Sequence, residues 1–484
     1  MKHFDAIIAG SGLGSLTAAS LLCNEGLKVG IIEQNYLPGG CTSSYWRKGF
    51  VFESGATTLV GIDDGMPLKY VLDKTGIKIN YRKLDLPMIV QLKNGLKLNR
   101  YQDINTWIDE AGSKFGNPDK QKKFWKKCYE ISHFVWENSS KQLNFPPTRV
   151  KDFIETIKQI APTHLKYGKY AFITIDNLLD KYELKDNPAF LDFVDEQLLI
   201  TAQNHRQEVN ALFGAAALCY TNFTNCYVDG GLINLIQPFI DYITKNNGKL
   251  ILRDPILKVS RNNQYVVETK KDKFTADYFI SGLPINNTVN LYTEQYIKSV
   301  NRKLLTSEQL NSAFQMGIGF RSAKKFESIH HQIHLKKPLA GTNSNSIFIS
   351  INHDDDYTRC DQEGTRVASV STHITDPENL YFDKGITEKE VITVLEEYGI
   401  LKSEEIIYQH ASTQKSWEKW TGRAFGFVGG YPQFRKIKPW QMIDARLDGH
   451  KAYICGDTAY PGQGIPGVTL SGIIAAHKLK QDWL

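Results

Sequence analysis

Closely spaced glycines near the amino end form a pattern that holds a phosphate group. The run reads Gly10-Ser11-Gly12-Leu13-Gly14-Ser15 and follows a short apolar stretch, Phe4 to Ala9. A helix-period stretch comes next and ends at Gly26. Gly10 permits a tight turn, and Gly12 lets the backbone approach a pyrophosphate that a side chain would block. The amino end of the helix offers free N–H groups and a positive dipole end to the same anion.

An acidic residue completes the pattern. A second apolar strand, Val29 to Ile32, leads to Glu33, 23 residues after Gly10. An acid here accepts hydrogen bonds from the ribose of an adenosine and repels the 2′-phosphate of NADP. Ser15 replaces the third glycine of the fingerprint and is small enough for close packing of helix on sheet. The order of strand, glycine turn, helix, strand and acid predicts a dinucleotide-binding βαβ unit.

The residues after Glu33 favour FAD over NAD. A diglycine, Gly39-Gly40, follows the acid by six positions, and a hairpin pattern comes after it, ending near Gly55. A small NAD-binding domain would enter its next helix here, whereas this is the extended flavoprotein pattern, in which a longer ligand continues past the pyrophosphate. We therefore expect the following residues to contact FAD: Gln34, Gly39, Gly40, Cys41 and Thr42.

A second glycine-rich segment lies near the carboxyl end. It reads YICGDTAYPGQGIPGVTLSGIIAAHKL, residues 453–479, with a short apolar strand, Gly456-Asp457, two Pro-Gly pairs and an apolar helix. Glycines in such number weaken any element that contains them, so the backbone here must come close to another group.

Length and composition indicate a globular protein of two or three domains. The chain has 484 residues, of which 42% are hydrophobic and 23% charged, which is ordinary for soluble proteins and too long for one core. The net charge of +6 is compatible with an anionic membrane surface. No concentrated basic and aromatic face suggests nucleic acid, so no such partner is expected. The sequence does not fix the oligomeric state.

The chain is expected to be cytoplasmic, with the membrane surface as an alternative location. No apolar run approaches the ~20 residues of a membrane span, and the first residues enter a strand directly, so no signal peptide is expected. The seven cysteines are odd in number and include no Cys-x-x-Cys pair, which fits reduced thiols. His330, His331 and His334, with Glu327 nearby, match no zinc motif; we interpret them as a polar strand and predict no metal site.

These motifs, with two segments in the middle of the chain, resemble the FAD-dependent phytoene desaturase, carotenoid isomerase and retinol saturase family, within the wider amine-oxidase-like flavoproteins. The first middle segment, Tyr227-Val-Asp-Gly-Gly-Leu-Ile-Asn-Leu, leads a helix that ends at Asn247-Gly248. The second, Lys249 to Pro284, has the pattern of three strands, at Leu250–Leu252, Tyr265–Glu268 and Ala276–Ser281. The matching pieces cover both ends and the middle of the chain, so the resemblance is global.

The resemblance implies an α/β fold in which an α+β substrate domain is inserted into a Rossmann-like FAD-binding domain that is discontinuous in sequence. The FAD-binding domain would comprise residues 1–68, 224–289 and 441–484. The substrate domain would comprise residues 69–223, mostly helical, and residues 290–440, mixed sheet and helix. Within it we expect an apolar-periodic run at Asn187–Cys219, strands at Ile347–Ile351 and Arg366–Thr372, and a helix at Glu388–Tyr398.

In this family the carboxyl-terminal Gly-Asp closes the flavin site. Carried over, Gly456 and Asp457 would meet the ribitol or pyrophosphate, and Gly464, Ile465 and Pro466 would lie against the isoalloxazine edge. The helix beginning near Val468 would point its amino end at N1 and the C2 oxygen, where a reduced flavin carries negative charge. Ile256, in the middle segment, is also implied as a cofactor contact.

The sequence departs from the family at two places. Many relatives carry Arg after the diglycine, where this chain has Cys41; the isomerases and saturases are similar to it in having a small residue there. Cys41 is interpreted as a packing residue, with a redox or covalent-flavin role as the alternative. Gly462-Gln-Gly464 looks like the isomerases and Ile465-Pro-Gly467 like the desaturases, so the motifs do not choose a subfamily.

Two further stretches have two interpretations each. In the glycine- and aromatic-rich run from Thr421 to Tyr431, the rings of Phe425, Phe427 and Tyr431 either face the substrate or belong to the core. A cluster of lysines and aromatics is either a membrane-docking face or a solvated helix face. Its members are Lys120, Lys122, Lys123, Phe124, Trp125, Lys126, Lys127 and Trp136.

No Ser-His-Asp, paired-carboxylate or metal constellation stands out, which fits a flavin that supplies the chemistry while the protein supplies orientation and electrostatics. We expect a FAD-dependent oxidoreductase acting on a hydrophobic small molecule, polyene-like as in carotenoids or retinoids, by desaturation, saturation or cis–trans isomerisation. One alternative is an amine-oxidase-like flavoenzyme acting on a polar amine. The other is a flavin-binding protein without turnover.

Overall fold

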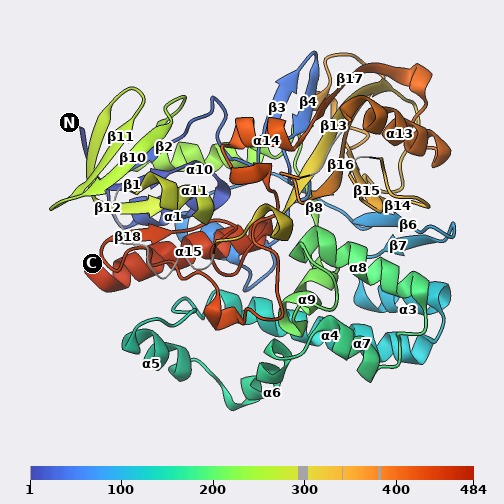
Figure 1. Ribbon diagram of the computed structural model, residues 1–484, viewed down its shortest axis with the longest axis horizontal. Helices are drawn as coiled ribbons and strands as arrows, with labels where there is room; N and C mark the ends of the chain where they lie inside the picture. The colour runs from blue at the N-terminus through green and yellow to red at the C-terminus, as the bar shows by residue number, and fades with distance from the viewer. Residues whose placement is uncertain (1, 293–303, 341, 380–382) are drawn as a thin grey trace.

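The computed structural model describes residues 2–292, 304–340, 342–379 and 383–484. It contains two large sheets at opposite sides of the molecule, with a layer of helices below them in Figure 1. The fold is α/β, as predicted. Part of the predicted segment 290–440, residues 293–303, 341 and 380–382, lies outside the described residues.

The first sheet contains the predicted βαβ unit. Its strand order is β10-β11-β12-β1-β2-β9, and β18 also pairs with β12. The neighbours β1, β2, β9, β12 and β18 are parallel, whereas β10, β11 and β12 form an antiparallel meander. The strands are β1 (Lys2–Ala9), β2 (Val29–Ile32), β9 (Lys249–Ile251), β10 (Ile256–Arg261), β11 (Tyr265–Thr269), β12 (Lys273–Ser281) and β18 (Ala452–Ile454).

Three helices pack together on this sheet. Helix α1 (Leu13–Asn24) joins β1 to β2 and packs against α10 (Ile233–Lys245) and α15 (Gly464–Trp483). Their apolar side chains share one core with β1 and β2, including Leu16, Ile236 and Ile473. Burial of that core holds the amino and carboxyl ends of the chain together.

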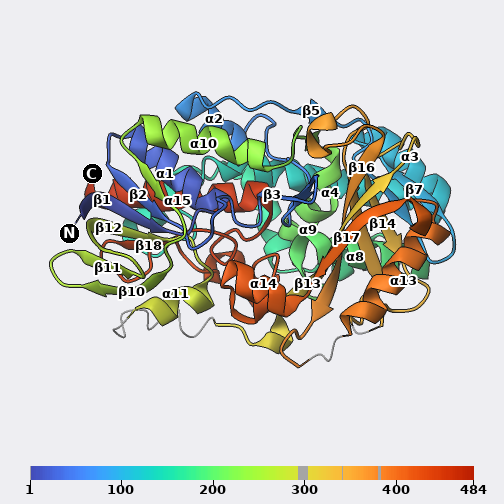
Figure 2. The same ribbon diagram turned by 90° about the horizontal axis from the view of Figure 1, so that it is seen from above.

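The second sheet has the order β17-β13-β16-β15-β14-β6-β7 and is antiparallel except between β14 and β6. Helix α13 (Lys384–Glu397) packs on its outer face through Val391 and Leu395, at the end away from the termini (Figure 2). The strands are β6 (Met88–Gln91), β7 (Lys97–Arg100), β13 (Asn311–Arg321), β14 (His330–His334), β15 (Ser346–Ile351), β16 (Thr365–Thr375) and β17 (Ile406–Ser412).

Helices from residues 104–218 form the layer below the sheets (Figure 1). Trp107, Trp125, Phe190 and Phe193 are fully buried there and pack ring against ring. The helices are α3 (Ile104–Phe115), α4 (Pro118–Ser139), α5 (Val150–Lys158), α6 (Leu165–Gly168), α7 (Ile175–Lys181), α8 (Pro188–Ala202) and α9 (Ala211–Leu218). The remaining elements are β3 (Ser44–Arg47), β4 (Phe50–Glu53), α2 (Pro67–Thr75), β5 (Arg82–Lys83), β8 (Cys226–Tyr227), α11 (Ile285–Leu291) and α14 (Gln414–Thr421).

The predicted elements are largely present, with corrections at their ends. The final helix begins at Gly464 rather than near Val468. The run Asn187–Cys219 is two helices, α8 and α9, and the predicted strands after Lys249 omit β10. Three histidines do lie on a strand, β14. The domain boundaries themselves stay a prediction.

Among the described residues, no helix combines the length and apolar character needed to cross a bilayer.

Candidate cofactor and substrate site

The glycine turn after β1 leaves its backbone uncovered. Gly10 has φ of +82°, and its amide donates to the Ile32 carbonyl at 2.8 Å. At Gly12, which precedes the first residue of α1, an added Cβ would meet no atom within 4 Å. The amino end of α1 therefore faces open space bounded by backbone amides, which suits an anion.

Glu33 lies beside this turn and is 7% exposed. One carboxylate oxygen accepts from the Ser11 amide at 2.9 Å and from the Ser11 hydroxyl at 2.7 Å; the other accepts from the Asn35 amide at 2.9 Å. These bonds fix the carboxylate at the carboxyl end of β2, next to Gly12. Its position fits the predicted ribose contact.

Close backbone packing explains two residues of the fingerprint. A Cβ on Gly14 would lie 3.0 Å from the Val468 carbonyl oxygen and 3.2 Å from the Gly456 amide nitrogen. A Cβ on Gly282 would lie 1.8 Å from the Ser15 hydroxyl oxygen. Leu13 is buried in the core beneath the turn. Helix α1 thus touches β12 and α15 at points where small residues are required.

The diglycine comes back to the same turn. The Gly39 amide donates to the Ser11 carbonyl at 3.0 Å, so Gly12 and Gly39 form a parallel bridge. Gly39 has φ of +98° and Gly40 of +58°, values that favour glycine. Gly40 is exposed. The structure therefore brings the first glycine cluster, the acid and the diglycine together, as predicted.

Gln34 and Ile256 lie at the outer rim of this group. Gln34 is exposed and its amide donates to the Trp420 carbonyl at 3.3 Å. Ile256 is half-buried at the start of β10, next to Asp254, whose amide donates to the Glu33 carbonyl at 3.0 Å. Both are near Glu33 in space, and their contact with a cofactor stays a prediction.

A cavity of about 810 Å³ continues from the second glycine-rich segment. Residues 464–468, the first turn of α15, line it, together with Cys41, Thr42 and Asp457. The first N–H groups of a helix have no partner within the helix, so this end of the cavity carries a positive dipole end. Gly456, with φ of +104°, connects β18 to this wall.

The rest of the cavity wall is mainly apolar. It includes Met66, Phe134, Phe172, Phe213, Phe348 and Trp417, from six distant parts of the chain. Among the described residues that line it, Asp457 is the only charged side chain. No lysine is among the described residues that line this space.

Arg423 pairs with Asp457 and was not predicted. Its Nη2 lies 2.8 Å from the Asp457 Oδ2, and its guanidinium carbon is 4.2 Å from the centre of the Phe427 ring. Its Nε is buried and has no partner among the described residues. Burial opposes the charge, but the Asp457 carboxylate holds the Arg423 pKa above its ordinary value. A single arginine in a loop gives no sequence signal for this position.

Cys41 lies within the field of the same guanidinium. Burial raises the pKa of its thiol, and the Arg423 charge offsets part of that rise. The thiol is therefore protonated at neutral pH, which supports the packing interpretation over a redox or covalent role.

Only one of the three predicted aromatics reaches the cavity. Tyr431 lines it, and its hydroxyl donates to the Asn286 side-chain oxygen at 2.8 Å. Phe427 is fully buried in the core beside the first sheet, and Phe425, with φ of +59°, packs on that core. Neither ring is among the described residues that line the cavity, which favours the core interpretation for Phe427 and leaves Phe425 half-buried at the edge of that core.

A group of polar side chains interrupts the apolar wall near α15, and no motif in the sequence predicted it. The side-chain nitrogen of Gln203 lies 3.3 Å from Nε2 of His373, and Gln433 and Gln463 line the same space. Burial lowers the pKa of His373 to about 4, so its imidazole is neutral at pH 7. Such a group can hydrogen-bond a hydroxyl or carbonyl in an otherwise apolar space.

Two of the three histidines of β14 make hydrogen bonds to backbone carbonyls. Burial lowers the pKa of His330, His331 and His334 to about 4. A ring nitrogen of His330 lies 3.1 Å from the Pro87 carbonyl, and one of His331 lies 2.9 Å from the Ser328 carbonyl. These bonds tie β14 to its neighbours.

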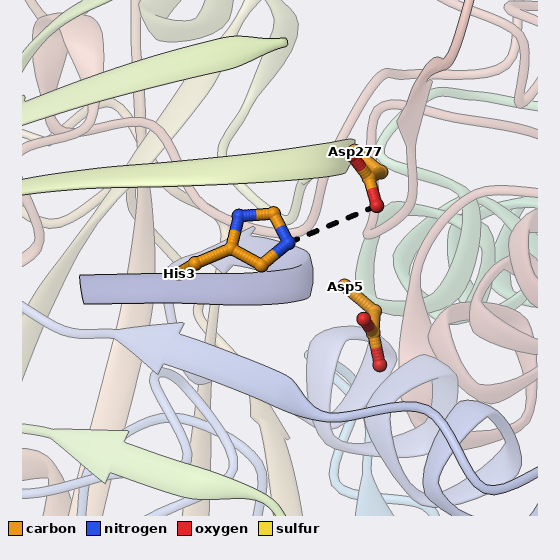
Figure 3. A group of neighbouring side chains, drawn as sticks. All are labelled: His3, Asp5 and Asp277. Atoms are coloured by element: carbon orange, nitrogen blue, oxygen red, sulfur yellow. Dashed lines mark ion pairs between the residues drawn. The ribbon is translucent and has the colours of Figure 1, made fainter. Parts of the chain in front are cut away.

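Another group, His3, Asp5 and Asp277, has the ligand types and mutual distances of a metal site (Figure 3). It lies at the surface, where His3 Nε2 is 3.8 Å from Asp277 Oδ2, and Asp5 accepts from the Lys28 amide at 2.7 Å. Exposed groups of this kind are common without an ion, and we assign no metal here.

The predicted lysine–aromatic cluster on α4 is a solvated helix face. Phe124 and Trp125 are fully buried, and Trp136 lines the cavity. Lys120 pairs with Glu183 at 2.9 Å, and Lys127 pairs with Glu130. The rings of Phe124 and Trp125 point inward and offer no apolar side chain to a membrane, and membrane contact through this helix stays a prediction.

Comparison with known proteins gives one family and distant relatives. The family described as flavin containing amine oxidoreductase matches residues 15–479. A prolycopene isomerase of an Oncidium hybrid cultivar is 23% identical over 99% of this chain and 84% of its own length. An all-trans-retinol 13,14-reductase of Danio rerio is 25% identical over 54% of this chain and 43% of its own length.

Solved structures share the fold at low identity. Putrescine oxidase, with putrescine bound, gives a TM-score of 0.63 at 16% identity, covering 99% of both chains. Cyclohexylamine oxidase from Brevibacterium oxydans IH-35A gives a TM-score of 0.63 at 12% identity, also covering 99% of both chains.

Proposed function

The chain belongs to the flavin containing amine oxidoreductase family, and on that premise we propose that its substrate is an elongated hydrophobic polyene of the carotenoid or retinoid kind. It is a FAD-dependent oxidoreductase. The proposed reaction is desaturation, saturation or cis–trans isomerisation of that polyene.

The residues at the site fit FAD. Open space in front of Gly12 and the amino end of α1 suits the pyrophosphate, and Glu33 suits the adenosine ribose. The buried Nε of Arg423, which has no partner in the part of the chain that the structure describes, and the amino end of α15 suit the negatively charged groups of the cofactor. FAD supplies the redox chemistry, by exchanging hydride or electrons with a substrate, and the protein supplies binding and electrostatics.

The cavity wall is the observation that carries the substrate class. A largely apolar cavity of about 810 Å³ favours a hydrocarbon chain, because each buried CH₂ contributes about 0.8 kcal/mol. The names of two relatives, prolycopene isomerase and retinol reductase, point to the same class.

The protein's own residues would orient such a substrate. The apolar wall excludes water, and the amides around His373 would hold a polar end group. His373, neutral at pH 7, can accept or release a proton through its imidazole. Arg423 holds the Asp457 carboxylate in place at the base of the cavity.

Amine oxidation is the second candidate, favoured by the family match and by the fold shared with putrescine oxidase. A cationic amine would need a compensating charge in the cavity, since burying an unpaired ammonium is costly. Asp457, the one carboxylate among the described lining residues, is already paired with Arg423. This electrostatic mismatch favours the polyene.

The test is an anaerobic incubation of FAD-loaded protein, oxidised or pre-reduced, with all-trans and cis polyenes and, separately, with primary amines. Loss of two hydrogens with oxidised protein would identify a desaturase. A gain of two hydrogens or an isomer of unchanged mass, only with reduced protein, would identify a saturase or an isomerase. Flavin reduction by amines alone would replace the proposal with amine oxidation. Normal FAD binding with no change in any arm would support a protein without turnover.

A further inference from the structure

A group of exposed apolar side chains lies on helix α5 and at the mouth of the cavity, and most soluble proteins would bury it. We call it the mouth surface. It consists of Val150, Phe153, Ile154, Ile157, Ile160, Leu165, Phe172 and Trp440. Val150 is 77% exposed, Leu165 70% and Ile157 65%. Contiguous exposed apolar side chains of this kind mark an interaction site.

Helix α5, which carries half of this surface, turns its apolar face to solvent and its polar face to the protein. An amphipathic helix of a soluble protein buries its apolar face. In α5 the fully buried residue is Asp152, whereas Phe153, Ile154 and Ile157 face solvent. Figure 1 shows α5 and α6 at the lower edge of the molecule.

Ion pairs hold α5 in this orientation. The Asp152 carboxylate accepts from Arg446 at 2.7 and 3.1 Å and from the Thr148 and Arg149 amides at 3.0 Å. Arg446 also donates to Asp482 at the end of α15. The polar side of the helix is thus attached to the protein, and its apolar side is directed outward by the same contacts.

The mouth surface continues into the cavity. Ile160, Leu165, Phe172 and Trp440 are exposed and also line the cavity wall. The rings of Phe172 and Trp440, which come from distant parts of the chain, lie 5.4 Å apart. An apolar path therefore leads from the outside of the molecule to its interior.

The charge around this surface is positive. Residues 149–172 contain five basic and two acidic side chains. Of the basic ones, Arg149, Lys158 and Lys166 form ion pairs with Asp482, Glu155 and Glu130. Residues 435–440 add Arg435, Lys436 and Lys438 without an acid. Lys438 Nζ lies 5.7 Å from the centre of the Phe172 ring, so its charge is at the edge of the apolar patch. Apolar side chains surrounded by cations complement the boundary of an anionic bilayer.

We propose that the mouth surface docks on an anionic lipid bilayer, with its apolar side chains in the headgroup–acyl boundary and the lysines at the lipid phosphates. Docking in this orientation opens the cavity toward the membrane, so a lipid-soluble molecule enters without crossing water. That loading step rests on the proposed function, whereas the docking surface rests on the exposed residues alone.

The test is co-sedimentation of the FAD-loaded protein with vesicles of phosphatidylcholine, with or without phosphatidylserine. We expect binding to the anionic vesicles with at least tenfold higher affinity than to the neutral ones. The variant Phe153→Ser/Ile157→Ser should lose at least tenfold in affinity while keeping its FAD content. A matched control, Ile386→Ser/Ile407→Ser, removes exposed apolar side chains elsewhere and should bind normally.

Three results would overturn the proposal. One is no binding to either vesicle, and another is equal binding by wild type and the Phe153→Ser/Ile157→Ser variant. The third is a dimer in light scattering that this variant converts to a monomer, because a second copy would then cover the surface. Polyene turnover in detergent separates the two proposals: turnover without vesicle binding contradicts only the docking, and vesicle binding without turnover contradicts only the substrate.

Discussion

The candidate FAD site around α1 is formed mainly by backbone atoms, whereas the substrate cavity is formed by side chains. Around the amino end of α1, the contacts are backbone amides and close approaches at Gly12, Gly14 and Gly39. The cavity wall consists of side chains from many segments, with no motif repeated among them. A backbone site tolerates few residue types at each position, whereas a wall of side chains tolerates many. Substitutions at the glycines should therefore lower FAD binding or stability, and substitutions in the cavity wall should change only the turnover of substrate.

The largest effect is expected from Gly14→Val with Gly12→Ala as its matched partner. The added side chain at Gly14 would meet the backbone of Val468 and Gly456, so we expect destabilisation by about 3 kcal/mol and no FAD. At Gly12 the space is open in the protein itself, so the fold should stay within about 1 kcal/mol of wild type. FAD affinity should still fall roughly tenfold to a hundredfold, because the methyl group enters the pyrophosphate space.

Urea unfolding of the FAD-free protein and titration with FAD measure the two quantities. Normal FAD affinity in Gly12→Ala would contradict the assignment of this turn to the pyrophosphate.

Arg423→Met tests the point where the two ends meet. It leaves the Asp457 carboxylate without its cation, and an unpaired, largely buried charge costs about 3 kcal/mol. Denaturant unfolding should show this loss, and the double variant Arg423→Met/Asp457→Asn should recover part of it. Equal loss in the single and double variants would mean that the ion pair is not the source of the effect.

Ala217→Phe probes the cavity wall alone. Ala217 lies on α9 and lines the cavity, so the larger ring shortens the space without reaching the glycine turn. We expect normal FAD content, and a fall of about tenfold in kcat/KM for long polyenes, equivalent to about 1.4 kcal/mol. Ala217→Ser, which is nearly isosteric, is the control. Loss of FAD in Ala217→Phe would show that the two ends are not separable.

The smallest effect concerns pH. Burial lowers the pKa of His373 to about 4 in the folded protein, whereas in the unfolded chain this pKa is about 6.5. Stability is therefore lost as pH falls from about 6.5 to about 4, because the unfolded state binds more protons. The slope of the unfolding free energy against pH reports how many more protons the unfolded state binds. In this window His373→Asn should reduce that number by less than one proton. An unchanged slope would mean that the pKa of His373 is the same in the folded and unfolded states, which contradicts its burial as a neutral imidazole.

The sequence predicted the backbone site because glycine spacing and a terminal acid leave few alternatives. Gly10, Gly12 and Glu33 could be assigned from the order of elements alone. Strand β13 shows the limit: Gly317 and Gly319 weaken a strand pattern, yet an added Cβ there would meet the rings of Phe52 and Phe50 from the β3–β4 hairpin. Such a requirement depends on a tertiary contact that periodicity does not contain.

Helices α4 and α5 show the same limit for burial. Both helices combine lysines with large apolar residues, but the sequence analysis considered a membrane-docking face only for α4. Phe124 on α4 is fully buried, whereas Phe153 on α5 is 52% exposed. The difference comes from Asp152, whose partner Arg446 lies almost 300 residues further along the chain.

The Asp152–Arg446–Asp482 ion pairs also constrain which segments can be exchanged between this protein and its relatives when a chimera is designed. Residues 69–223 include α5 and much of the cavity, and would be a natural segment to exchange in order to graft a new specificity. A chimera that imports only this segment would bring a buried carboxylate without its arginine, or lose the carboxylate that orients α5. The loop that carries Arg446, together with the last turn of the final helix that carries Asp482, should therefore be transplanted with this segment.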